Sequence, residues 1–101
     1  MTLHGIDIDA DTIADFCRRN GIRRFSLFGS ILRDDFRPES DIDVLVEFEP
    51  DERVGLFRLT GMEIELGAIL GRKVDLNTEG FLSPYFRDRV LSEAVLQYVA
   101  A

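Results

Sequence analysis

The chain has 101 residues, of which 46% are apolar and 31% are charged, and its formal net charge is −7. These values are typical of one small globular domain and exclude a disordered chain. The acidic balance argues against direct duplex nucleic-acid binding, which needs a basic surface. No apolar run approaches the roughly 20 residues of a membrane span. With a single cysteine and a polar, acidic start, we expect a cytoplasmic protein.

The first regular element is expected to be a helix over residues 9–20. Acidic residues occupy its first turn and Arg18 and Arg19 its last, which matches the helix dipole. Asn20-Gly21 provides a stop. We expect the residues before this helix, including His4, to be a frayed terminus.

Two strands are expected next, over 23–28 and 41–48. A short helical turn at 30–33 and a polar loop to residue 40 separate them. In the second strand every other residue is apolar, which predicts one buried face: Ile42, Val44, Val46 and Phe48. Asp41 and Asp43 fall on its opposite face.

The second half of the chain predicts a helix over 55–70 that stops at Gly71, and a short strand over 72–76. A last helix is expected from Ser83-Pro84 to about residue 95. Residues 96–100 fit either a continued helix or an edge strand. The apolar side of the last helix is expected to consist of Phe86, Val90, Leu91, Ala94 and Val95.

This order of elements predicts a small α/β (α+β) fold, in which helices cover mainly one face of a short mixed sheet. The other face would be partly open and would carry the acids. Phe81, Leu82 and Phe86 fit either core packing, which is favoured, or an exposed docking patch.

The acids Asp41 and Asp43 project from one face of a strand, about 7 Å apart. Asp75 has the same parity on another strand, so three carboxylates converge if the two strands are neighbours. Anions this close raise one another's pKa, and a hard divalent cation such as Mg²⁺ relieves the repulsion. Two such ions about 4 Å apart stabilise the attacking and leaving oxygens of a nucleotidyl transfer. The pattern therefore predicts a site for two Mg²⁺ ions.

Gly29-Ser30 directly follows a predicted strand and supplies the features of a phosphate site. Glycine lets a phosphate approach the backbone, the amides that open the next helical turn point at the anion, and the Ser30 hydroxyl can donate a hydrogen bond. Arg33 lies one helical turn further on and could pair with a phosphate or an acid. Gly-Ser or Asp-x-Asp alone is a weak signal, but their combination at this spacing favours a nucleotidyltransferase site.

Gly29-Ser30, ten residues and then Asp41-x-Asp43 resemble the signature of the DNA-polymerase-β-type nucleotidyltransferase superfamily. The stretches "RRFSLFGSILRDDFRPESDIDVLVEFEP" and "LGAILGRKVDLNTEG" resemble the minimal nucleotidyltransferases, often called MNT antitoxins. The resemblance covers roughly residues 20–100 and implies one minimal nucleotidyltransferase domain over 1–101.

The resemblance implies a role for each motif residue. Gly29-Ser30 would hold the phosphates of the nucleotide, with Arg33 at a frequent basic position. Asp41 and Asp43 would bind two metal ions. Asp75 matches the third acid, which helps to activate the attacking hydroxyl and can ligate a metal.

Members of this family are often paired with a helical HEPN ribonuclease toxin, and some transfer AMP from ATP to a tyrosine of that toxin. The resemblance thus implies a Mg²⁺-dependent protein adenylyltransferase that acts as the antitoxin of a type VII-like pair, in a hetero-oligomer with its toxin. Two alternatives stay open, namely an antitoxin that acts by binding alone and a nucleotidyltransferase for a small molecule.

Overall fold

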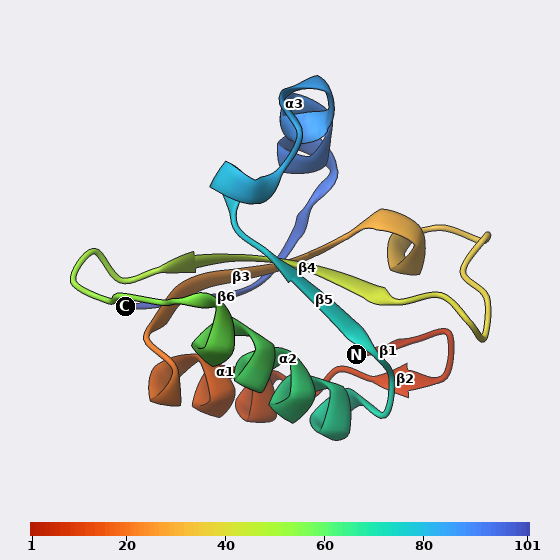
Figure 1. Cartoon of the computed structure of the whole chain (residues 1–101). Helices are drawn as coiled ribbons and strands as arrows, with labels where there is room; N and C mark the ends of the chain where they lie inside the picture. Colours follow the sequence, from red (N-terminus) through yellow and green to blue (C-terminus); the bar gives the residue numbers. More distant parts are fainter.

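The computed structural model describes all 101 residues, as a four-stranded sheet, an N-terminal hairpin and three α-helices (Figure 1). Along the chain the elements are β1 (Thr2–Leu3), β2 (Ile6–Asp7), α1 (Ala10–Arg19), β3 (Ile22–Phe28), the 3₁₀ helix η1 (Gly29–Leu32), β4 (Ile42–Phe48), α2 (Leu56–Leu70), β5 (Val74–Asn77), the 3₁₀ helix η2 (Glu79–Phe81), α3 (Pro84–Glu93) and β6 (Val95–Val99). No helix is long and apolar enough to span a membrane.

The main sheet has the strand order β5-β4-β3-β6. β3 runs antiparallel to both β4 and β6, whereas β4 and β5 are parallel. The sheet is therefore mixed, as expected. Helices α1 and α2 lie side by side against one of its faces (Figure 1).

The core lies between that face and the two helices. Ile42, Val44 and Val46 of β4 are at most 2% exposed, and they pack with fully buried Phe16 of α1 and Leu66 of α2. The apolar positions have the two-residue period of a strand and the roughly 3.6-residue period of a helix. The alternation predicted for β4 is thus confirmed, with Phe48 at the end of the strand only half-buried.

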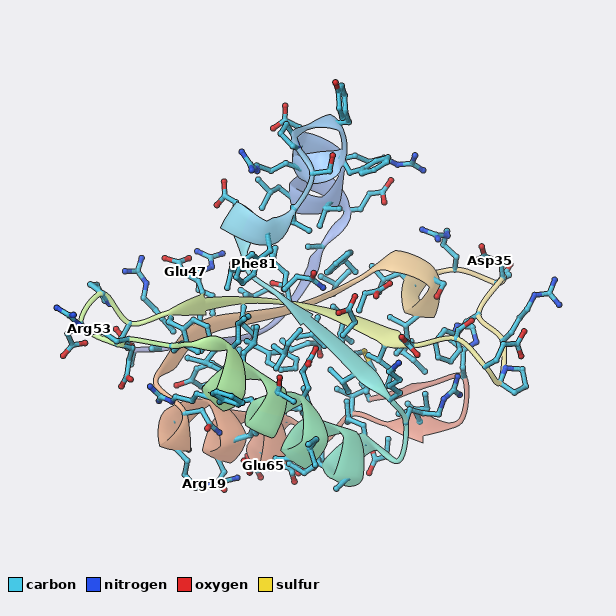
Figure 2. All side chains as sticks on the ribbon, in the orientation of Figure 1. Arg19, Asp35, Glu47, Arg53, Glu65 and Phe81 are labelled. Carbon is cyan, nitrogen blue, oxygen red and sulfur yellow. The ribbon has the colours of Figure 1, made fainter.

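The outer surfaces of α1 and α2 are joined by an ion pair. Arg19 Nη1 lies 2.6 Å from Glu65 Oε2, and the same arginine contacts Asp15 within α1. Figure 2 shows Arg19 and Glu65 together in the helical layer, with Phe81 on the other side of the sheet. Both partners of the interhelical pair are partly exposed, so packing contributes more to stability than this contact does.

The helix ends follow local capping rules. Asp9 accepts a hydrogen bond from the Thr12 amide as the N-cap of α1. Gly71 ends α2 with a φ of 73°, a left-handed value that favours glycine. Ser83 caps α3 and Pro84 takes its first helical position. These start and stop predictions are confirmed.

Two of the three helices share one face, as expected, and helix α3 is the exception (Figure 1). It lies across the opposite, acid-bearing face, and none of its residues is buried (Figure 1). Helix α2 connects β4 to β5 in one direction across the sheet, and α3 connects β5 to the parallel strand β6 in the reverse direction. Because such crossovers are right-handed, reversing the direction moves the second helix to the other face.

Two further differences concern the chain ends. Helix α3 stops at Glu93, and the following residues pair with β3 as the edge strand β6, which decides between the two readings of 96–100. The N-terminus is not frayed, because β1 and β2 form a hairpin. His4 Nε2 lies 3.0 Å from the Ile31 carbonyl oxygen, and the centroid of its ring lies 4.8 Å from that of Phe36, with the two planes tilted by 31°.

The core predicts a sharp contrast between two aliphatic residues of α2. Leu66 is 0% exposed and Ile64 is 70% exposed. Leu66→Ala should lower the free energy of unfolding by about 2–5 kcal/mol, because it removes buried methyl groups and leaves a cavity. Ile64→Ala, the matched control, should change it by less than about 0.5 kcal/mol. Urea unfolding followed by circular dichroism measures both, and equal losses would contradict this core.

Candidate active site

Asp43 and Asp75 lie opposite each other on the open face of the sheet. They are paired positions of the parallel strands β4 and β5, and both have the parity that points away from the core. Asp41 stands immediately before β4, with the Lys73 Nζ 3.9 Å from its Oδ2. The topology thus places all three predicted acids on one face.

The surroundings of Asp43 disfavour its charged form. Burial raises the pKa of its carboxyl to about 6, with further contributions from the negative charges of Asp75 and Asp41. The positive charge of Arg33 acts in the opposite direction. A carboxylate in this state gains more than an ordinary one from a cation placed beside it.

Gly29 forms the close wall of this acidic site. It follows Phe28, which is the register partner of Asp43 across β3 and β4. Its φ is 79°, and a Cβ atom there would come within 3.1 Å of Asp43 Cγ, with the carboxylate oxygen closer still. A side chain at this position would therefore be strained and would displace the carboxylate. Only glycine lets the backbone of η1 approach the acids this closely.

Ser30 and Arg33 frame the same turn. Ser30 lies in η1, and its carbonyl accepts a hydrogen bond from the Arg33 amide at 2.9 Å. The Arg33 Nε donates to Asp35 at 3.2 Å, and the guanidinium lines a groove with Gly29. The predicted phosphate-site residues are thus neighbours in space as well as in sequence.

Two residues that the sequence analysis did not single out hold the acids in place. The Glu63 Oε2 of α2 accepts a hydrogen bond from the Leu76 amide at 2.8 Å, directly after Asp75. Arg72 donates to the carbonyls of Arg37 and Ser40, both at 2.7 Å, at the end of the loop that leads to Asp41. No local sequence signal marks these contacts, because each joins segments distant in the chain.

The donor set on this face suits a hard cation. Carboxylate oxygens are the ligands that Mg²⁺ prefers, and Asp41, Asp43 and Asp75 could supply them. No three His, Cys, Asp or Glu side chains are gathered into a ready-made metal-binding group in the structure. The pairing of β4 with β5 brings the acids to one face of the sheet, where their oxygens would be available to such a cation.

Comparison with known sequences identifies the family of this chain. Residues 10–97 match the model of the nucleotidyltransferase domain family. A Methanocaldococcus jannaschii chain named "Putative protein adenylyltransferase" is 42% identical over 77 residues, which are 76% of this chain and 81% of that one. The protein adenylyltransferase MntA of Thermococcus cleftensis is 38% identical, over 76% of each chain.

Two solved structures share the fold. A toxin–antitoxin crystal structure with AMP-PNP has a TM-score of 0.74, at 20% identity, over 92% of this chain and 75% of that one. The tri-AMPylated Shewanella oneidensis HEPN toxin in complex with MNT antitoxin has a TM-score of 0.66, at 20% identity, over 90% of this chain and 70% of that one. With the family match, the fold and the sequence relatives, the chain belongs to the minimal nucleotidyltransferases of the nucleotidyltransferase domain family.

The raised pKa of Asp43 predicts that its charged carboxylate lowers the free energy of unfolding. Its folded-state pKa of about 6 exceeds the ordinary 3.8, so the folded protein loses stability relative to the unfolded chain as the pH rises from about 4 to 6. Asp43→Asn should therefore raise the free energy of unfolding by about 1–2 kcal/mol at pH 8, allowing for partial exposure of the group, and should bring no such gain below pH 4.

Urea unfolding in EDTA at the two pH values measures this difference. Asp51→Asn, in the exposed turn after β4, is the matched control and should change the stability by less than about 0.5 kcal/mol at either pH. If Asp43→Asn lowers the free energy of unfolding at pH 8, the charged carboxylate does not destabilise the folded protein and the prediction is wrong.

Proposed function

We propose that this chain is a Mg²⁺-dependent protein adenylyltransferase, which acts in the cytoplasm as an antitoxin and transfers AMP from ATP to a tyrosine hydroxyl of a HEPN ribonuclease toxin. The observation that carries the proposal is the approach of Gly29 to Asp43, with Asp75 opposite on the neighbouring strand. This arrangement supports the proposal, because nucleotidyl transfer needs a phosphate-binding turn beside metal-binding carboxylates.

Each part of the site has a role in this transfer. Gly29, Ser30 and Arg33 would bind the phosphates of ATP, and Asp41, Asp43 and Asp75 would hold two Mg²⁺ ions. The ions, when bound, neutralise charge that develops on the phosphoryl oxygens. The acceptor oxygen forms a bond to the α-phosphorus while the bond to the bridging oxygen of the β-phosphate breaks, and pyrophosphate leaves. Asp75 is exposed on the open face, where it can take the hydroxyl proton.

A protein acceptor is supported by the apolar surface and by the relatives. Leu56 and Phe57 of α2 and Phe81 of η2 are 74%, 97% and 65% exposed. Exposed apolar groups of this size mark interaction surfaces when they cluster, and Leu56 and Phe81 line one shared groove. The names of the relatives describe protein adenylyltransferases, and one structural neighbour is bound to an AMPylated HEPN toxin.

The two alternatives make different demands on the acids. An antitoxin that acts by binding alone needs no metal-binding carboxylates. The electrostatic repulsion of Asp43 by Asp75 and Asp41 would then serve no function. A small-molecule enzyme would transfer AMP without a protein partner. The intact set of acids favours transfer over binding alone.

The proposal predicts AMP transfer that depends on the acids. We would incubate the protein with Mg²⁺, ATP and a purified HEPN ribonuclease, and measure the intact mass of the ribonuclease. The wild type should add one or more AMP units and abolish the ribonuclease activity. Asp41→Ala/Asp43→Ala should lower the transfer rate at least about 100-fold, because the ion-binding charge is lost.

Two controls separate the outcomes. EDTA should stop the wild-type reaction, and Asp51→Ala should leave its rate unchanged. Full neutralisation by the double variant without any mass gain would contradict the enzyme and support binding alone. Transfer to a small acceptor in the absence of the ribonuclease would support the third reading.

A further inference from the structure

A groove between η1 and α3 opens directly beside the phosphate-binding turn. One wall comes from the end of β3 and from η1, and the other comes from α3. Its lining residues are Phe28, Gly29, Arg33, Phe86, Arg89, Val90 and Glu93. A second hollow shares Gly29, Arg33 and Glu93 and extends the groove toward Val95. Gly29 therefore belongs both to the acidic site and to this groove.

The α3 wall carries an aromatic ring and a guanidinium on one side of the helix. Phe86 and Arg89 are three residues apart, which places them on neighbouring positions of a helix surface. Phe86 is 60% exposed, although its ring lines the groove. An aromatic ring left this accessible beside a phosphate-binding turn has no partner in the protein core.

Two arginines face the groove in the same way. Arg89 donates through Nε to Glu93 at 3.1 Å, and Arg33 donates through Nε to Asp35 at 3.2 Å. Neither guanidinium makes a hydrogen bond through its two terminal nitrogens. Each side chain is thus oriented by a carboxylate, while the terminal nitrogens that bind phosphate best stay free.

The start of α3 is fixed to η2, so the groove wall is a defined surface. Arg87 donates through Nε to the Glu79 carbonyl at 3.2 Å and through Nη2 to the Leu82 carbonyl at 3.1 Å. Phe86 precedes this anchor in the chain and lines the groove beside η1. The helix can therefore present Phe86 and Arg89 to a ligand although none of its residues is buried.

We propose that Phe86 and Arg89 complete the nucleotide site, with the Phe86 ring stacked on the base of ATP and Arg89 paired with its phosphates opposite Arg33. The inference rests on the proposed function and extends it to residues outside the Gly-Ser and Asp-x-Asp motifs. A nucleotide combines a flat base with an anionic chain, and the groove offers an aromatic face and two guanidinium groups beside Gly29. Stacking on a single aromatic ring stabilises any base, because it involves the flat face of the base and not the hydrogen-bonding groups on its edge.

The test compares a ligand that has a base with one that lacks it. The wild type and each variant are titrated in Mg²⁺ by calorimetry with AMP-PNP and, separately, with inorganic tripolyphosphate. Phe86→Ala should weaken AMP-PNP binding about 10-fold or more, which is the size of effect expected when one stacking contact is lost. It should change the affinity for tripolyphosphate by less than about 2-fold, because this ligand has no base to stack on the ring. Arg89→Ala should weaken the binding of both ligands.

Two further variants sharpen the result. Phe86→Tyr keeps the aromatic face and should restore AMP-PNP affinity to within about 3-fold of wild type. Tyr85→Ala removes the neighbouring ring, which is 93% exposed and lies outside the groove, and should change the affinity for neither ligand. Because Phe86 is largely exposed, the melting temperature of each variant should stay close to that of the wild type.

The inference is overturned if Phe86→Ala leaves AMP-PNP binding unchanged or weakens both ligands equally. In the first case, a loss of HEPN binding by the same variant would assign the ring to the protein partner. If the wild type bound neither ligand, the proposed function itself would fail. If the wild type binds AMP-PNP and Phe86→Ala binds it with the same affinity, only the role of Phe86 is rejected and the proposed function stands.

Discussion

The two-residue period of β4 ties the core of this protein to its acids. Ile42, Val44 and Val46 are buried against the helices, so Asp43 must point to the opposite face. A shift of one residue in the register of β4 would bury carboxylates and expose the core. The hydrophobic contacts that stabilise the sheet therefore also determine where the acids stand. Parallel pairing with β5 then adds Asp75 beside Asp43.

The electrostatic arrangement of this face works against folding and in favour of function. Burial and the charges of Asp75 and Asp41 raise the pKa of Asp43, whereas a structural carboxylate usually gains a partner that lowers it. Functional sites are where proteins tolerate such unfavourable charge, because a ligand relieves it. The fold compensates elsewhere, with a continuous apolar core between the sheet and two helices.

The position of α3 follows from topology more than from the composition of the helix. Crossovers between parallel strands are right-handed as a rule, and the chain reverses its direction across the sheet after β5. The last helix is thereby placed over the acid-bearing face, beside η1. A small domain thus gains a second wall for its site without adding a second domain.

The sequence by itself determined the elements and the motif. Periodicity and caps predicted α1, α2, β3, β4 and β5 to within about two residues, because these signals are local. The spacing of the Gly-Ser and Asp-x-Asp motifs indicated the class of chemistry. The acids lie on or beside strands, so the two-residue period of the strand showed from the sequence that they share one face. The left-handed φ of Gly29 is a second reason for glycine at this turn, and it became visible only in the structure.

Only the tertiary structure decided how distant segments meet. The N-terminal hairpin, the edge strand β6 and the face occupied by α3 depend on pairing and crossover direction, which no local pattern encodes. The apolar residues of α3 looked like a core stripe, yet the helix buries none of its residues. The supports from Glu63 and Arg72, and the groove formed by Arg33, Phe86 and Arg89, likewise join residues far apart in the chain. Such contacts form only once the order of the strands in the sheet is fixed. For that reason the sequence could predict the positions of the acids on their strands, but not the residues from distant segments that surround them.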